Sequence, residues 1–149
     1  WCEIDDQPAF QIGSCEVTWR RQQHPGGSVG YRLDFPEARL LYLTDTVGDD
    51  SESALQWYQD ADLMMHECYF GEARAQWATK TGHTWTGRLA KIAQSAAPQK
   101  LLLTHVNPLD AEPSVMMTEV DAALSTEGTD SGVELHLAAD RDRIDFGPA

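Results

Sequence analysis

The sequence has few basic residues for its size. It contains 11 Lys and Arg against 24 Asp and Glu, which gives a formal net charge of −13. No Lys or Arg occurs between Arg39 and Arg74, whereas eight acidic residues do. Proteins that bind nucleic acids gain most of their affinity from Lys and Arg side chains that neutralise phosphates. The charge therefore argues against a large RNA or DNA partner and favours a small substrate.

Cysteine, long apolar runs and targeting segments are also scarce or absent. The three cysteines are odd in number and lack Cys-x-x-Cys spacing, so we expect free thiols rather than disulfides or a cysteine-rich zinc site. No apolar run approaches the roughly 20 residues of a membrane span. No basic segment followed by an apolar stretch marks a signal peptide. We therefore expect a cytoplasmic protein without membrane association, and its 149 residues suffice for one domain.

The order of the expected elements indicates the α/β class, because strands come first and then alternate with helices. Short alternating or apolar runs predict the strands, and apolar residues at spacings of three and four predict the helices. Ser51 and Thr84 are the expected N-caps of two helices. The expected strands lie within 10–20, 29–35, 39–43, 63–66, 100–104, 133–137 and 143–146, the last two forming a closing pair after a loop at 125–132. The expected helices lie at 51–59, 71–79, 84–97 and 112–124.

Polar side chains stand where strands end. Asp45 follows the apolar run 40–43, His105 follows the run 101–103, and His24 precedes a Pro-Gly-Gly turn. Side chains just past the carboxyl ends of strands point into the crevice where α/β proteins build their sites. Imidazole and carboxylate ligands suit zinc, iron or manganese. Taken alone, each residue is better explained as one that caps or hydrogen-bonds a neighbouring loop, but the three together predict a metal-dependent hydrolase.

Two further residues extend this cluster. His83 directly precedes the helix expected at 84–97, and a histidine near a helix N-terminus can contact an anion or transfer a proton. Glu67 follows the strand expected at 63–66 and can hold that histidine in one tautomer. The alternative for His83 is an ordinary turn residue. For His66 and His136 we expect structural roles, the first beneath the site and the second inside a strand.

These motifs resemble the C-terminal half of a metallo-β-lactamase-fold hydrolase. The pair His66-Glu67 and the triplet 82–84 also resemble signatures of the tRNA 3′-processing endonuclease (RNase Z) branch and related phosphodiesterases. The resemblance implies an αββα sandwich, of which this chain covers about the C-terminal half. The matching segments, which occur in the family's order, are 24–31, 42–46, 66–67, 82–84 and 103–105.

The resemblance also implies roles for five residues. His24 ligates a first metal, His105 ligates a second, and Asp45 bridges the two and takes part in catalysis. Glu67 and His83 form a catalytic pair near the leaving group or the substrate phosphate. The implied cofactors are two divalent ions, most simply Zn²⁺ with Mn²⁺ or Fe as alternatives, which generate a metal-bound hydroxide. The expected activity is that of a phosphodiesterase acting on a small phosphodiester or nucleotide.

One family motif is missing. The remaining metal ligands of the family lie in a His-x-His-x-Asp-His motif, which does not occur in the sequence. We therefore expect residues 1–149 to be the C-terminal part of a metallo-β-lactamase-like domain that is inactive by itself. A separate chain that supplies the motif, or a homodimer, is the alternative way to complete the site.

A second interpretation stays open: a non-catalytic half-domain that binds a partner. The sequence has five tryptophans, and aromatic side chains of this kind provide the anchors of many interfaces. Core packing is the better explanation for most of them. A β-lactam hydrolase is disfavoured, because neither a signal peptide nor a cysteine pair typical of export is present.

Overall fold

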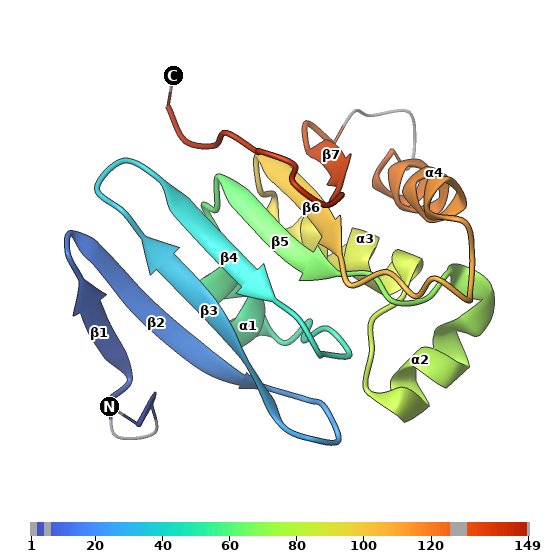
Figure 1. Ribbon diagram of the computed structural model, residues 1–149, viewed down its shortest axis with the longest axis horizontal. Coiled ribbons are helices and arrows are strands. Elements are labelled where there is room, and N and C mark those ends of the chain that lie inside the picture. Colours follow the sequence, from blue (N-terminus) through green and yellow to red (C-terminus); the bar gives the residue numbers. More distant parts are fainter. Residues whose placement is uncertain (1–2, 5–6, 126–130, 149) are drawn as a thin grey trace.

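One sheet organises the molecule, and Figure 1 shows it in a computed structural model that describes residues 3–4, 7–125 and 131–148. In this part of the chain the strands pair in sequence order, antiparallel from β1 to β4 and parallel from β4 to β7. The α/β class is therefore confirmed. The strands are β1 (Ala9–Ile12), β2 (Cys15–Gln22), β3 (Ser28–Asp34), β4 (Arg39–Leu43), β5 (Leu63–Glu67), β6 (Lys100–Thr104) and β7 (Glu134–Leu137).

Helices connect the parallel strands. Helices α1, α3 and α4 lie on one face of the sheet, and α2 lies beyond the ends of β4 and β5 (Figure 1). None of the described helices is long and apolar enough to cross a membrane. The helices are α1 (Glu52–Tyr58), α2 (Ala75–Thr81), preceded by the 3₁₀ turn η2 (Glu72–Arg74), α3 (Thr86–Ala96) and α4 (Pro113–Leu124).

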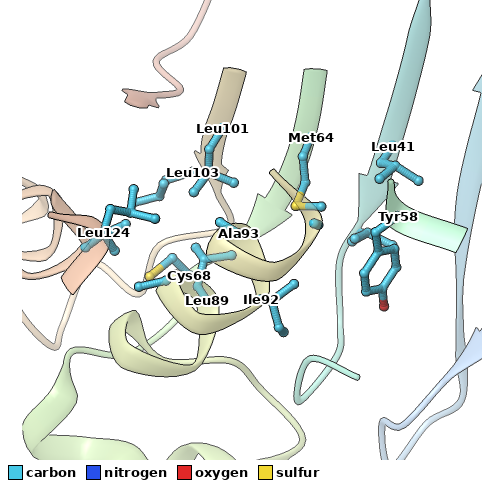
Figure 2. Close-up of a cluster of buried hydrophobic side chains, with 14 of the residues drawn as sticks. Leu41, Tyr58, Met64, Cys68, Leu89, Ile92, Ala93, Leu101, Leu103 and Leu124 are labelled. Carbon is cyan, nitrogen blue, oxygen red and sulfur yellow. The ribbon is translucent and has the colours of Figure 1, made fainter. Parts of the chain in front are cut away.

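The core lies between these helices and the parallel strands. Alternate strand residues point to the same face, so Leu41 and Leu43 of β4 both face the helices and are almost fully buried. Leu89, Ile92 and Ala93 of α3 recur at helical spacing and belong to the same buried cluster, part of which Figure 2 shows. This packing holds β4, β5 and β6 in place relative to one another. The candidate site residues lie at or just after the carboxyl ends of these strands.

The opposite face of the sheet carries apolar residues without a helix layer in the described chain. Tyr42 pairs in register with Tyr31, and its side chain is 38% exposed. Leu40 and Met65 of the same face are half-buried. Apolar side chains that gather on one sheet face without a covering layer are a candidate contact surface for another protein layer.

Two strand and cap expectations are wrong. Residues 143–146 form no strand, because the C-terminal segment runs across the amino ends of the parallel strands, where Lys100 Nζ donates to the Asp145 carbonyl oxygen at 2.9 Å (Figure 1). Strand β7 instead pairs in parallel with β6. Helix α3 begins at Thr86 rather than Thr84, because the Thr84 hydroxyl donates to the Thr46 carbonyl oxygen and does not cap the helix. Of the loop expected at 125–132, residues 126–130 lie outside the described chain.

Candidate metal centre

The ends of three parallel strands and one hairpin converge at one edge of the sheet. Asp45 follows β4 and His105 follows β6, and both have left-handed backbone conformations with φ of 51° and 48°. Such conformations are uncommon for residues other than glycine and concentrate at functional sites. They turn the chain sharply as it leaves each strand, and both side chains stay at this edge.

His24 reaches the same edge from the hairpin between β2 and β3. Its Nδ1 accepts a hydrogen bond from the Gly26 amide at 3.3 Å, and its Nε2 lies 3.8 Å from Asp45 Oδ1. The Ser28 hydroxyl donates to the Asp45 carbonyl oxygen at 2.6 Å and ties the hairpin to the end of β4. Gly82 has a φ of +90°, and a Cβ there would lie 2.2 Å from Pro25 Cδ. Glycine is therefore required where the hairpin packs against the loop that carries His83.

Asp45 stands between two imidazoles. Its Oδ1 lies 3.8 Å from Nε2 of His24 and 3.8 Å from Nδ1 of His105. Ligand atoms bind Zn²⁺ at about 2.0–2.2 Å, so two ligands of one ion lie roughly 3–4 Å apart. Among the described residues, Asp45 has no Lys or Arg partner, and its side chain is 41% exposed. The chemistry and the spacing of these donors fit divalent metal ions.

Glu67 and His83 form a hydrogen-bonded pair beside this trio. The Glu67 side chain is fully buried and accepts hydrogen bonds from the backbone amides of Thr46 and Thr84. His83 Nδ1 lies 3.0 Å from Glu67 Oε2. Burial raises the pKa of the Glu67 carboxyl to about 8, although the two amides lower it in part. Near neutral pH the pair therefore holds one readily exchanged proton.

The His83 ring is fixed in position by its neighbours. It stacks on Tyr69 with ring centroids 4.2 Å apart and an interplanar angle of 18°. The rings of His24 and His105 contact it edge-on at 5.3 and 5.5 Å. Burial, reinforced by these two histidines, lowers the pKa of the His83 imidazole, and Asp45 opposes this shift. The ring is held with Nδ1 directed to Glu67.

All five candidate residues thus meet at one edge of the sheet. One ligand atom each from His24, Asp45 and His83 lie within 4.8 Å of one another, as do those from Glu67, His83 and His105. His83 belongs to both groups. The structure therefore brings together every residue that the sequence nominated for metal binding or catalysis.

The two remaining histidines lie outside the cluster. His66 is fully buried, and its Nδ1 donates to the Glu67 carbonyl oxygen at 2.7 Å. Burial lowers the pKa of the His66 imidazole to about 4. His136 Nε2 lies 2.7 Å from Glu134 Oε1 on β7. Neither residue reaches the cluster, so their structural roles stay a prediction, and Cys15 and Cys68 are free thiols.

Sequence reasoning missed two contributors to the site. Tyr69 stacks on His83 and also contacts the His105 ring at 5.0 Å. Its position two residues after β5 is the only signal that the sequence offers. Thr46 contributes a backbone amide to Glu67, and no side-chain pattern reveals such a role.

Comparison with known proteins identifies the family. A family model described as the beta-lactamase superfamily domain matches residues 1–106. The chain belongs to this superfamily. Ribonuclease Z from Methanosarcina acetivorans is 35% identical over 72 residues, which is 48% of this chain and 23% of that protein. Ribonuclease Z from Prochlorococcus marinus (strain MIT 9313) is 34% identical over 97 residues, which is 62% of this chain and 30% of that protein.

Solved structures support the fold. The metallo-beta-lactamase fold protein YhfI from Bacillus subtilis aligns with a TM-score of 0.76 at 24% identity, over 89% of this chain and 51% of that one. Human tRNase Z, short form, aligns with a TM-score of 0.71 at 19% identity, over 97% of this chain and 49% of that one. The metallo-β-lactamase-like fold and the resemblance to the RNase Z branch are confirmed. This superfamily chain spans about half of these structures and less than a third of the curated relatives.

Proposed function

We propose that this superfamily chain carries part of the active site of a metal-dependent phosphodiesterase that cleaves RNA. One observation carries the proposal: five side chains able to bind metal or transfer protons converge at the carboxyl edge of the sheet. Among the described residues, the ion-pair contacts of Asp45 are with two histidines and not with Lys or Arg. A carboxylate used only for stability would ordinarily be paired with a cation.

His24, Asp45 and His105 are the residues that would hold divalent metal, with Asp45 shared between two ions. When bound, two such ions supply Lewis-acid charge to the phosphate and lower the pKa of a coordinated water. Zn²⁺ is our preferred metal, although the same ligands accept Mn²⁺ and Fe.

The Glu67–His83 pair moves the proton. Glu67 is anchored by two backbone amides, so it holds the His83 ring with Nδ1 inward and leaves Nε2 for proton transfer. His83 then donates its Nε2 proton to the oxygen of the leaving group, as a general acid, while its Nδ1 takes up the proton shared with Glu67, so that no imidazolate is left behind. Stacking on Tyr69 keeps the ring in this orientation and shields one of its faces from water.

We propose RNA as the substrate, in place of the small phosphodiester that the net charge led us to expect. The curated relatives are named ribonuclease Z, which argues against the small-substrate expectation. Several acids of the stretch from Asp45 to Glu72 are paired with basic side chains, so the net charge overstates the repulsion of a polyanion. Asp50, for example, binds Arg88 at 3.0 Å and Lys91 at 3.2 Å on the helix-covered face. These acids therefore add little repulsion at the site.

Three ligands do not complete a dinuclear site, because each zinc ordinarily takes four ligands. We propose that residues outside this sequence supply the rest, from a second layer that packs on the uncovered sheet face around Tyr31 and Tyr42. That these 149 residues correspond to about half of the structural neighbours supports this arrangement. The non-catalytic interaction module remains the alternative, since it would use the same apolar face.

The test is cleavage of a 5′-labelled RNA with a 3′ extension by the protein expressed from its full coding sequence. We expect metal-dependent cleavage that is abolished by a chelator and restored by Zn²⁺ or Mn²⁺. His105→Ala serves as the matched inactive variant. Absence of cleavage with full metal loading would contradict the enzyme and favour the interaction module.

A further inference from the structure

A groove of about 460 Å³ adjoins the metal centre. It shares Tyr69 and His83 with the site and extends from them towards α2. One wall is formed by Arg74 and Trp77, and the other by Asn107 and the two residues at 109 and 110. Its volume lies within the range of about 300–1,000 Å³ that is typical of small-molecule sites. If a nucleotide of an RNA strand is held at the metal centre, the next nucleotide of that strand can therefore reach this groove.

The groove exposes two large apolar side chains. Trp77 is 53% exposed and Leu109 is 90% exposed, although both line one hollow. Tyr69 also lines the groove, and its ring stacks on His83 with centroids 4.2 Å apart. Exposed aromatic rings beside a catalytic centre are the usual platform for unpaired bases, because every base presents a flat π face. The groove therefore has the chemistry of a base-stacking site.

Arg74 brings positive charge to this groove in an otherwise acidic protein. Its Nε lies 3.2 Å from Asp110 Oδ1, and the Asp110 side chain is only 6% exposed. Asp110 Oδ2 also accepts a hydrogen bond from the Gly71 amide at 2.9 Å, which ties the two walls together. The Arg74 side chain remains 57% exposed. A guanidinium oriented by a buried carboxylate is well suited to bind a phosphate.

We propose that this groove binds the base of a nucleotide next to the scissile phosphate, stacked on Trp77, with Arg74 on the adjoining backbone phosphate. This inference rests on the proposed function and names the part of the RNA that the site selects. Trp77 and Arg74 would then determine which RNA substrates bind. Leu109 would contact the face of the base that is turned away from the Trp77 ring. Neither residue takes part in the chemical step.

The first arm of the test measures binding by the 149-residue chain, so it does not depend on catalysis. Adenosine monophosphate is titrated by calorimetry, with ribose 5-phosphate as the probe that lacks a base. We expect adenosine monophosphate to bind at least about fivefold more weakly to Trp77→Ala, and Trp77→Phe to restore most of the affinity. Lys80→Ala is the matched control, because Lys80 lies on α2 but does not line this groove. Equal affinity of the wild type and Trp77→Ala would overturn the proposal.

The second arm uses the protein from the full coding sequence and RNAs in which each nucleotide in turn is abasic. We expect one abasic position to lower kcat/KM of the wild type at least about fivefold and to have no further effect in Trp77→Ala. If the abasic position and Trp77→Ala instead lower kcat/KM independently, so that their effects multiply, the groove proposal is overturned. The proposed RNA cleavage would be unaffected by that result. If the wild type cleaves no RNA, the proposed function fails and the binding arm alone decides on the groove. A dimer that Trp77→Ala dissociates, without nucleotide binding, would assign the groove to a second copy of the chain.

Discussion

The two edges of the parallel strands both carry carboxylates, but only one carries a candidate site. At the amino edge, Asp62 accepts hydrogen bonds from the Arg39 amide and from Gln99 Nε2, each at 2.7 Å. Asp60 lies 3.6 Å from the Arg39 guanidinium. A cavity of about 480 Å³ opens there and is lined by these residues. At the carboxyl edge, Asp45 lies between two histidines instead.

The difference teaches that neither negative charge nor a cavity marks the site in this protein. At the amino edge the carboxylates have cationic or amide donors of their own, so they stabilise a corner of the fold. At the carboxyl edge the neighbours of Asp45 are the imidazoles of His24 and His105, which can bind either a metal ion or a proton. The hydrogen-bond or ion-pair partner of a carboxylate is therefore a better indicator of a metal site than its charge or a nearby cavity. Substitutions at the two edges should differ accordingly.

The largest effect is expected for the metal ligands. Asp45→Asn and His105→Ala should each lose metal at one position, and phosphodiester hydrolysis by the full protein should fall by more than about a hundredfold, since even second-shell changes cost 10–100-fold. Asp62→Asn at the amino edge is the matched control and should keep both metal and activity. Metal content by mass spectrometry and steady-state rates measure the two effects. Unchanged turnover in Asp45→Asn would remove the distinction between the edges.

His83 should separate chemistry from metal binding. His83→Ala should retain metal but lower turnover by about 10²–10⁴-fold, because the general acid is removed. Glu67→Gln should lower turnover less, since His83 remains, although one backbone amide then faces an NH₂ group and the fold is destabilised. Loss of metal in His83→Ala would mean that His83 is itself a metal ligand. The experiment tests this directly, because His83 belongs to both groups of potential ligands.

His66, beneath the site, predicts a dependence of stability on pH. Its pKa is about 4 in the folded chain against an ordinary 6.5, so the unfolded chain binds the proton more readily between these values. Stability should therefore fall as the pH drops from 6.5 towards 4, by about 2 kcal/mol at pH 5 relative to His66→Leu. Urea unfolding of both proteins at several pH values measures the difference. A difference that does not change with pH would refute the buried neutral imidazole.

The smallest effect is expected at the amino edge. Asp60 is 77% exposed, and its ion pair with Arg39 is open to solvent. Such pairs contribute about 0–1 kcal/mol, so Asp60→Ala should change the free energy of unfolding by less than about 1 kcal/mol and leave metal content unchanged. Denaturant unfolding and metal analysis check both statements. A loss of metal in Asp60→Ala would show that the two edges are coupled.

Sequence reasoning predicted that the candidate residues would cluster, because the relevant information is local. Each of Asp45, Glu67 and His105 directly follows or ends an apolar strand, and parallel strands bring such positions to one edge. The strand expected at 143–146 was wrong because its alternating pattern cannot reveal that the segment crosses the sheet instead of pairing with it. The Thr84 cap was wrong for a similar reason, since a distant carbonyl of Thr46 captures its hydroxyl.

Long-range charge pairing was the other feature that sequence reasoning could not supply. The acidic composition suggested a site that repels polyanions, yet Asp50 is neutralised by Arg88 and Lys91, which lie about 40 residues further along the chain. The groove beside Tyr69 likewise forms from residues of α2 and of the loop after β6. Pairings of this kind depend on the tertiary fold and leave no local pattern.

The most direct test of the central claim is a calorimetric titration of Zn²⁺ into the 149-residue chain and into its Asp45→Ala/His105→Ala double variant. If the carboxyl edge holds metal, the wild type should bind Zn²⁺ and the double variant should not, while an Asp60→Ala/Asp62→Ala control should behave as the wild type. Equal binding by the wild type and the Asp45/His105 double variant would contradict the account.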